Sequence, residues 1–452
     1  MQENGFKHSV KVPRLYKIAA KIVQQVREEG ASIKHLVYQA KHPNYPAILA
    51  LVTQTLQNGK HLDYILRKSK ILMNEARFDP WLARILITEL LWGKKRLAGD
   101  AKPIQTILSY ETKLKSILDK LIESKEIIKP KKVTKPRYVR INTLVMTVAD
   151  AINGFRDEGW IFVRNNHTVY EDFLQMIRTL EENQFTTDLH VPDLLVFPQG
   201  TNFYTHPCYQ DGSIILQDKA SCIPALLLNP TPNSVVLDMC AAPGMKTSQL
   251  AAAMNNEGLV YAVEKDQRRF QSLTQIMETV GATCVKTVNR DVLTLSDKEF
   301  PDVEYILLDP SCTGSGMTDR LMYDDNTDEQ RNAERIEKLA GFQKKILYHA
   351  LKNFPKVKRI VYSTCSIYPE ENEMIVKKVM ENCKNFKLKN ARKGLKTKWI
   401  NSMNNENDGE YKKILKRCIY AKPEVDLTNG FFVAVFERIT PKEENKMEVE
   451  SE

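Results

Sequence analysis

The second half of the chain alternates between short apolar runs, which are typical of β-strands, and helical patterns. Strands are expected at SVVLDMC (from Ser234), LVYAVEK, 283–288, VEYILLDPSC, RIVYSTCSI and GFFVAVFERI, and the helices between them include 334–353 and 370–381. This regular alternation predicts a parallel sheet with helices on both faces, which is a doubly wound α/β fold. Two polar stretches, 319–337 and 384–416, interrupt the pattern and are expected to be surface insertions.

Residues 1–125 are predicted to form an all-helical amino-terminal domain. Apolar residues recur at helical spacing from Leu15 to Val26, and similar patterns cover 46–57 and 61–73. Asp79-Pro80 stands where a further helix is expected to begin, because aspartate caps helices and proline suits the first helical position.

A basic linker is predicted at 126–136, where prolines alternate with lysines. One interpretation is a contact with an RNA backbone, because Lys and Arg attract phosphates whatever the sequence. The other is a solvated connection between domains. Both interpretations remain open from the sequence.

A small α/β module is predicted at 137–205. Its expected elements are a strand at Arg137–Asn142, helices over 147–159 and 170–183, and a strand at Leu194–Phe197. A strand around Ile214 then introduces the last domain, 206–439. The tail 440–452 is too polar to join a core and is expected to be disordered.

The charge and cysteine content narrow the classes of protein that this chain can be. Its 66 Lys and Arg outnumber its 56 Asp and Glu, so a polyanionic partner is plausible. The eight cysteines include no C-x-x-C pair and there is no His cluster at zinc spacing, which disfavours a disulfide framework and a metal site. No signal peptide and no uncharged apolar run of about 18 residues is present, so a soluble, intracellular protein without a membrane segment is expected.

The segment DMCAAPGMKT, Asp238–Thr247, follows a predicted strand and opens a helix, whose free amides suit a negatively charged group. The glycine patterns of dinucleotide and ATP sites are absent, so NAD and ATP are disfavoured. Glu264 ends the next strand, where an acidic residue can bind both hydroxyls of a ribose. Together these features indicate an adenosine-type ligand, the alternative being that the strand-end acid only caps a helix.

Two predicted strands each end close to a cysteine. Asp309 and Cys312 follow the apolar run Tyr305–Leu308, and Cys365 ends the strand RIVYSTCSI, 53 residues after Cys312. Ligands in open α/β sheets bind at the carboxyl ends of the strands, so both thiols are expected at one cleft. This arrangement suggests nucleophilic catalysis by a thiolate.

The motifs DMCAAPGMKT, LDPSCTGSG, YSTCSIYPEENE and NGFFVAVFERI resemble, in this order, those of the Sun-type family of S-adenosylmethionine-dependent RNA 5-methylcytosine methyltransferases. The resemblance covers roughly 137–439 and is greatest to the family's fifth eukaryotic branch, whose members methylate a cytosine of large-subunit ribosomal RNA. It implies a Rossmann-like methyltransferase sheet, a small module for RNA recognition, RNA or a pre-ribosomal particle as partner, a nuclear and nucleolar location, a monomer and no metal.

The resemblance also implies a role for each site residue. The loop around the methionine end of the cofactor would consist of Cys240, Ala241, Ala242, Pro243, Gly244, Met245 and Lys246. Glu264 would hold the ribose with help from Arg269, and Asp291 would lie beside the adenine. Asp309 would contact both cofactor and base, Cys365 would be the nucleophile, and Cys312 would assist release.

Three positions depart from the family pattern. Met245 replaces a common glycine, Glu264 stands where many members have aspartate, and Asn429 replaces the usual aspartate before Gly-Phe-Phe. None of these changes removes a reacting group. The alternatives are an rRNA-binding assembly factor whose catalysis is secondary or lost, a methyltransferase acting on tRNA, and a DNA cytosine methyltransferase, which would use Cys312 as nucleophile.

Overall fold

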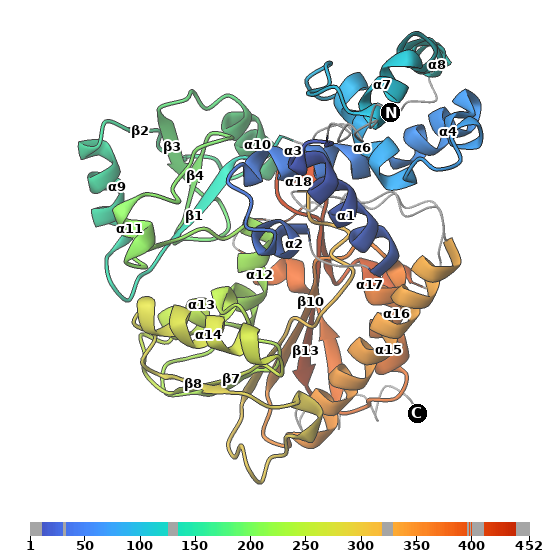
Figure 1. Cartoon of the computed structure of the whole chain (residues 1–452). Helices are drawn as coiled ribbons and strands as arrows, with labels where there is room; N and C mark the ends of the chain where they lie inside the picture. Colours follow the sequence, from blue (N-terminus) through green and yellow to red (C-terminus); the bar gives the residue numbers. More distant parts are fainter. Residues whose placement is uncertain are drawn as a thin grey trace, which may run out of the picture. The chain divides into compact units, whose positions relative to one another are not determined.

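The computed structural model describes residues 11–29, 33–124, 134–318, 329–395, 397, 399 and 411–439 (Figure 1). The chain divides into two compact units, one formed by 1–132 with 321–332 and the other by 133–320 with 333–452. Most of the predicted basic linker and the whole predicted disordered tail lie outside the described residues.

The first unit is helical, as the sequence predicts. Its helices are α1 (Arg14–Glu29), α2 (Ile33–Gln39), α3 (Tyr45–Gln57), α4 (Gly59–Ser69), α5 (Ile71–Asn74), α6 (Pro80–Leu91), α7 (Lys102–Ser109) and α8 (Glu111–Glu123). The Asp79 carboxylate caps α6 by accepting the N–H groups of Trp81 and Leu82, both at 2.8 Å. The single helix predicted over 61–73 is wrong, because Lys70 has a φ of 60° and separates α4 from α5.

The second unit contains two sheets, of which the smaller has the strand order β2-β3-β4-β1-β5. Its strands are β1 (Arg137–Ile141), β2 (Ile161–Phe162), β3 (Gln184–Thr187), β4 (Leu194–Phe197) and β5 (Ile214–Ile215), and its helices are α9 (Val148–Asp157), α10 (Tyr170–Arg178) and α11 (Pro207–Gln210). The predicted strands β1 and β4 are confirmed, whereas β2 and β3 were not predicted. Because β5 pairs antiparallel with β1, the fifth strand of this sheet comes from beyond residue 205.

The larger sheet has the order β11-β13-β10-β9-β6-β7-β8, with β12 beside β13. Its strands are β6 (Val235–Asp238), β7 (Leu259–Val263), β8 (Val285–Val288), β9 (Tyr305–Leu308), β10 (Arg359–Thr364), β11 (Phe386–Lys389), β12 (Ile419–Ala421) and β13 (Phe431–Arg438). The five neighbouring strands β8, β7, β6, β9 and β10 are parallel to one another, and β13 pairs antiparallel with β10. The doubly wound prediction is therefore confirmed, with an antiparallel edge added to it.

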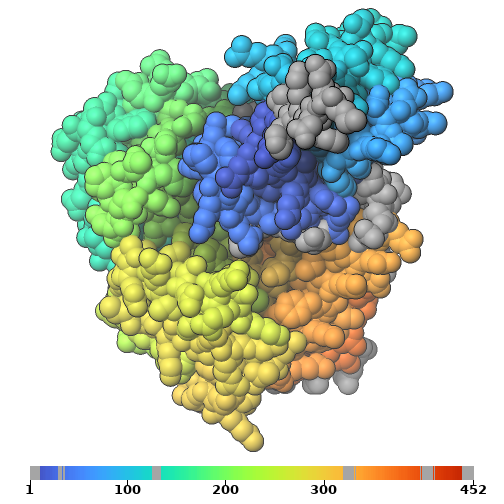
Figure 2. Space-filling view, viewed as in Figure 1, coloured from blue at the N-terminus to red at the C-terminus, as the bar shows by residue number. Residues whose placement is uncertain are grey.

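Helices cover both faces of the larger sheet (Figure 1). The helices after β5 in the chain are α12 (Lys219–Leu228), α13 (Met245–Ala253), α14 (Gln267–Thr279), α15 (Glu329–Asn353), α16 (Glu373–Met380), α17 (Lys412–Leu415) and α18 (Pro423–Asp426). Alternate residues of β9 separate the two layers, because Leu307 packs in the cluster with α12, α13 and α14, while Leu308 packs in the cluster with α15 and α16. Figure 2 shows the yellow residues around α14 and the orange residues of α15 at the molecular surface.

Both predicted surface insertions contain regular structure instead. Helix α15 begins at Glu329, inside the stretch 319–337, and β11 lies inside 384–416. Phe386 and Leu388 of β11 are buried and alternate with half-buried lysines, and the strand pairs with β13. The sequence prediction failed there because lysine-rich composition concealed a short period-two pattern.

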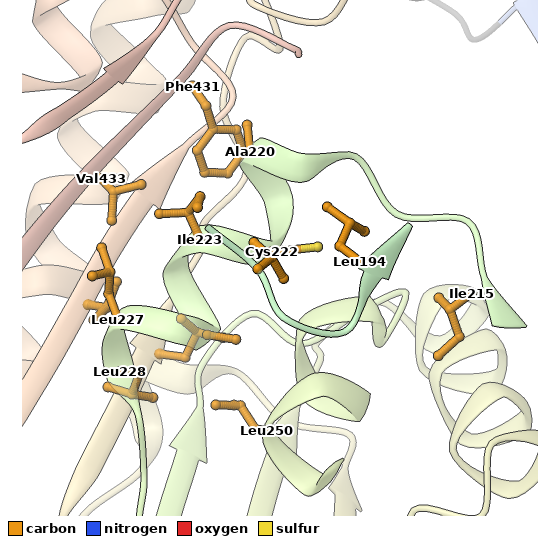
Figure 3. Close-up of a cluster of buried hydrophobic side chains, with 14 of the residues drawn as sticks. Leu194, Ile215, Ala220, Cys222, Ile223, Leu227, Leu228, Leu250, Phe431 and Val433 are labelled. Carbon is orange, nitrogen blue, oxygen red and sulfur yellow. The ribbon is translucent and has the colours of Figure 1, made fainter. Parts of the chain in front are cut away.

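The small sheet and the large sheet share one hydrophobic core. Figure 3 shows Cys222 and Ile223 of α12 lying between Leu194 of the small sheet and Val433 of β13. The second unit therefore has no solvent layer between its small module and its larger sheet at this contact.

A buried ion pair lies in the same region. Lys219 Nζ is 2.7 Å from Asp188 Oδ2, and both side chains are fully inaccessible. The Lys219 ammonium also lies 4.8 Å from the ring centre of Tyr170 and 5.4 Å from that of Trp399. Burial, reinforced by the charge of Lys219, lowers the pKa of neighbouring His190 to about 3, so His190 is neutral. The charge of Lys219 is therefore compensated by Asp188 in a buried site that the rings of Tyr170 and Trp399 help to form.

We predict that Lys219→Met destabilises the second unit, because it leaves the Asp188 carboxylate buried without its cation. Breaking a buried pair in this way costs about 3–5 kcal/mol of unfolding free energy. Urea denaturation followed by tryptophan fluorescence measures the loss. The double variant Lys219→Met with Asp188→Asn should recover part of it, whereas a single variant as stable as the wild type would contradict the prediction.

Candidate active site

The carboxyl ends of β6, β9 and β10 lie side by side in the larger sheet. Leu307 of β9 is in register with Asp238 of β6, and Leu308 is in register with Tyr362 of β10, all in parallel pairs. The residues that follow these strands therefore emerge at one edge, which we call the carboxyl edge. This is where parallel α/β sheets bind ligands.

The two strand-end cysteines meet at the carboxyl edge. Cys312 Sγ and Cys365 Sγ are 3.2 Å apart, and both residues are partly exposed. The hydrogen bond with Cys365, followed by burial, raises the pKa of the Cys312 thiol well above its ordinary value. Cys312 is therefore held as a neutral thiol, a form that can donate a proton to a neighbouring group.

Asp309 is the acidic group nearest to this pair in sequence, and two side chains fix its carboxylate. Lys246 Nζ lies 2.7 Å from Oδ2, and the Ser363 hydroxyl donates to Oδ1 at 2.7 Å. Burial alone would lower the pKa of Lys246, but the charge and hydrogen bond of Asp309 outweigh it and raise that pKa. The side chain of Asp309 is 27% exposed, so one side of the carboxylate remains accessible to a ligand.

Lys246 has a second role as a link between helices. Its Nζ also donates to the Ser221 hydroxyl of α12 at 3.0 Å and lies 5.3 Å from the ring centre of Phe431. The ammonium thus joins α13, α12 and β13 to Asp309. Neither Ser221 nor Ser363 was identified from the sequence. Ser363 could have been considered, because it lies in the predicted strand that ends at Cys365.

The loop 240–246 turns tightly into α13. Gly244 has a φ of 110°, and a Cβ there would lie 2.7 Å from Met277 Cε, so only glycine fits without strain. Ala242 O accepts a hydrogen bond from Arg269 Nη2 at 2.7 Å, and Met245 packs partly buried against the core. Burial raises the pKa of the Cys240 thiol, which disfavours its thiolate form.

Glu264 lies just after β7 and is nearly buried. Its carboxylate accepts the N–H of Asp266 at 2.8 Å and pairs with Arg269 Nη1 at 3.1 Å. Because Arg269 also binds Ala242 O, this arginine connects the acidic residue to the loop 240–246. The helix cap that the sequence left as an alternative role for Glu264 belongs to Asp266 instead, whose carboxylate accepts the N–H groups of Arg268 and Arg269 at the start of α14.

Asp291 lies beyond the end of β8. It caps the short turn η1 (Val292–Thr294) by accepting the N–H of Leu293 at 3.0 Å, and Lys265 Nζ is 2.7 Å from its other oxygen. The hydrogen bond from Lys265 is the main cause of a lowered pKa for the Asp291 carboxyl. All of the sequence-selected residues therefore follow strands of the larger sheet at the carboxyl edge.

Asp238 is the buried acid at the end of β6. The Thr247 hydroxyl donates to its Oδ2 at 2.8 Å, which ties the strand to the first turn of α13. Burial raises the pKa of Asp238 from its ordinary 3.8 to about 7, although the Thr247 hydrogen bond opposes the shift.

The described residues contain neither a cluster of metal ligands nor a membrane-spanning helix. No group of three or more His, Cys, Asp or Glu side chains among these residues could hold a metal ion. None of the helices that the structure describes combines the length and apolar composition needed to cross a bilayer.

Comparison with protein families matches three descriptions along the chain. Residues 225–437 match the 16S rRNA methyltransferase RsmB/F family, 135–217 match the ferredoxin-like domain of NOL1/NOP2/Sun domain family member 5, and 47–134 match the N-terminal domain of the same member. The match to a ferredoxin-like domain begins before β1 and includes β5, in agreement with the observed small sheet.

Curated relatives match over nearly the whole chain. A 28S rRNA (cytosine-C(5))-methyltransferase of Drosophila melanogaster is 41% identical, and the alignment covers 95% of this chain and 97% of the relative. The Mus musculus protein of the same description is 37% identical, with 94% and 91% covered. Among solved structures, the crystal structure of PH0851 covers 95% of this chain and 100% of its own with a TM-score of 0.61; at 21% identity it shows a shared fold.

We predict that Asp238→Asn changes how the stability of the second unit depends on pH. Between about pH 4 and pH 7 native Asp238 binds a proton that the unfolded chain has released, so raising the pH through this window destabilises the wild type. Asparagine has no such proton. The unfolding free energy of the variant, relative to wild type, should therefore be higher at pH 8 than at pH 5, by up to about 4 kcal/mol, since one pKa unit is about 1.4 kcal/mol. Urea denaturation at the two pH values measures this difference. A difference that does not change with pH would contradict the assignment.

Proposed function

This chain belongs to the NOL1/NOP2/Sun family of RNA cytosine-C5 methyltransferases, and from that membership we propose that it methylates carbon 5 of a cytosine in large-subunit ribosomal RNA, with S-adenosylmethionine as methyl donor. The target is proposed because the fly and mouse relatives are described as 28S rRNA enzymes. Such a target places the enzyme in the nucleus and nucleolus, where we infer that it acts as a monomer.

The observation that supports this function best is the proximity of the Cys312 and Cys365 thiols, close to Asp309, which forms an ion pair with Lys246. Carbon 5 of cytosine is a poor nucleophile until a thiolate adds to carbon 6. Cys365 is assigned this addition, which gives an enamine that takes up the methyl group at carbon 5. Loss of the proton from carbon 5 and expulsion of the Cys365 thiolate then complete the cycle. A protein that only binds RNA has no need of two thiols at 3.2 Å.

Cys312 is assigned the second half of the reaction. Its thiol is protonated next to Cys365, so it can donate that proton to the departing Cys365 sulfur and, as the resulting thiolate, take up the proton that carbon 5 loses. Asp309 in its protonated form can donate a hydrogen bond or its proton to the ring nitrogen of the cytosine and so assist the addition, while Lys246 fixes the position of its carboxyl group. The base must leave its stack to reach these groups, which favours a loop or a remodelled RNA.

The residues at the carboxyl edge fit an S-adenosylmethionine site by their chemistry. The bound donor would supply a methyl group on a positively charged sulfur. The Glu264 carboxylate, fixed by Arg269, suits ribose hydroxyls, and Asp291 beyond β8 suits the adenine side. The loop 240–246 would bind the methionine portion at the start of α13, where backbone N–H groups favour a carboxylate.

We predict that the alanine variants of the two cysteines differ in whether the covalent RNA adduct forms. Cys365→Ala should lose methyl transfer by at least about a thousandfold and form no covalent RNA adduct, because no other thiolate can add to the base. Cys312→Ala should accumulate that adduct, because addition proceeds but release does not. Denaturing gels and tritium transfer to an rRNA fragment measure both.

Cys208→Ala, in half-exposed α11, is the matched control and should resemble the wild type. An adduct in Cys365→Ala, with none in Cys312→Ala, would mean that the two roles are reversed.

Bisulfite sequencing tests the substrate directly. Cells lacking the protein should lose methylation at one cytosine of large-subunit rRNA, and wild type but not Cys365→Ala should restore it. Loss confined to tRNA would refute the rRNA assignment. Restoration by Cys365→Ala would instead favour an assembly factor without catalysis.

A further inference from the structure

We propose that Glu371 and Gln343 are positioning residues that hold the Cys312 thiol against Cys365, so that breakdown of the covalent adduct depends on them. The role in adduct breakdown rests on the proposed function, whereas the effect of the two residues on the position of the Cys312 thiol can be measured without RNA. Neither residue reaches the carboxyl edge as a reacting group, because both are fully buried behind the loop that carries Cys312.

Glu371 forms hydrogen bonds with Thr313, the residue that follows Cys312. It lies in the turn η2 (Pro369–Glu371), and its Oε1 accepts the N–H of Thr313 at 3.0 Å. Its Oε2 accepts the hydroxyl of the same threonine at 2.6 Å. One carboxylate thereby fixes both the backbone and the side chain of Thr313.

Gln343 of α15 forms a hydrogen bond with Ser311, the residue that precedes Cys312. Its Nε2 donates to Ser311 O at 3.0 Å and to Glu371 Oε1 at 2.8 Å. The pair therefore binds the two neighbours of Cys312 in sequence, and leaves the cysteine between them with little freedom to move.

Cys365 is held mainly by other contacts. It follows β10, which pairs with β9 on one side and β13 on the other. The preceding Thr364 donates its hydroxyl to Asn372 Oδ1 at 2.5 Å. Because the strand pairing of β10 does not involve Glu371, a change at Glu371 should displace Cys312 relative to Cys365, rather than displace both together.

The charge of Glu371 matters to this arrangement. Among the described residues, the contacts of its carboxylate come from neutral donors, namely the Thr313 N–H, the Thr313 hydroxyl and the Gln343 amide. Burying an ionised carboxylate is costly unless its oxygens accept hydrogen bonds. In Glu371→Gln, an amide N–H in place of Oε2 would force the Thr313 hydroxyl to become an acceptor, and the charge that strengthens the hydrogen bonds to the Cys312 loop would be lost, so the loop is held more weakly.

The first experiment measures the spacing of the two thiols in the full-length protein without RNA. Diamide removes two electrons and two protons from Cys312 and Cys365 and is itself reduced to its hydrazine, so a disulfide forms at a rate that depends on how the thiols are placed. Peptide mass spectrometry follows that bond. Glu371→Gln should slow its formation roughly tenfold or more, because small displacements of reacting groups have large effects on rate.

Glu373→Gln is the matched control. Glu373 is also buried and lies two residues away, but it accepts the Tyr420 hydroxyl rather than a group of the Cys312 loop. It should form the disulfide at the wild-type rate. Should Glu371→Gln fold poorly, Thr313→Val removes the hydroxyl that donates to Glu371 while nearly preserving the shape of the side chain, and Thr313→Ser retains the hydroxyl. Equal disulfide rates in Glu371→Gln or Thr313→Val and the wild type would overturn the proposal.

The second experiment uses the rRNA fragment. Glu371→Gln should accumulate the covalent adduct and slow its release roughly tenfold, with adduct formation little changed. In the Cys312→Ala background the same substitution should add nothing, because the group that it positions is absent. Full additivity would mean a general structural role and would refute the inference. If the wild type itself transfers no methyl group to rRNA, the proposed function fails, and the diamide rates still decide the positioning.

Discussion

Three chain segments meet at the carboxyl edge through backbone groups, at a point where no side chain fits. Gly316 N–H donates to Cys365 O at 2.9 Å, and Gly430 N–H donates to Gly316 O at 2.7 Å. A Cβ on Gly316 would lie 2.2 Å from Gly430 O, so the loop after β9, the end of β10 and the start of β13 can approach only because glycine stands there. The proximity of the two thiols depends on this contact, since it joins the loop of Cys312 to the carbonyl of Cys365.

Two ion pairs of the second unit meet at α12. Lys219, its first residue, pairs with Asp188 of the small module, and Ser221 accepts from Lys246, which pairs with Asp309. Buried Arg140 of β1 adds a third link, because its Nη2 donates to Ser248 Oγ in α13 at 2.6 Å. The small module is thus connected to the loop 240–246 by charged hydrogen bonds as well as by the shared apolar core. A displacement of β1 would be transmitted to the start of α13.

The sequence was informative where chemistry coincides with a strand end. Cys312 and Cys365 could be identified because each follows an apolar run, and parallel strands bring their ends to one edge. Gln343 and Glu371 could not be selected, because their partners are 32 and 58 residues away and nothing local marks their side chains as buried. The break at Lys70 was missed for a similar reason, since a lysine with a positive φ has no sequence signature. Local patterns therefore predicted elements and reacting groups, and tertiary hydrogen bonding determined the residues that support them.

Two of the three departures from the family pattern, Met245 and Asn429, have local physical explanations. Met245 packs its side chain against the core, while its carbonyl accepts from Arg140 Nη2 at 3.3 Å, an interaction that does not depend on the side chain. Asn429 Oδ1 accepts from Lys135 Nζ at 2.8 Å, and its backbone N–H donates to Asp218, which pairs with the same lysine. An aspartate at 429 would place a second carboxylate beside Asp218. The neutral amide keeps the hydrogen bond from Lys135 without this repulsion, so the substitution preserves the structure at the start of β13 and leaves the reacting groups unchanged.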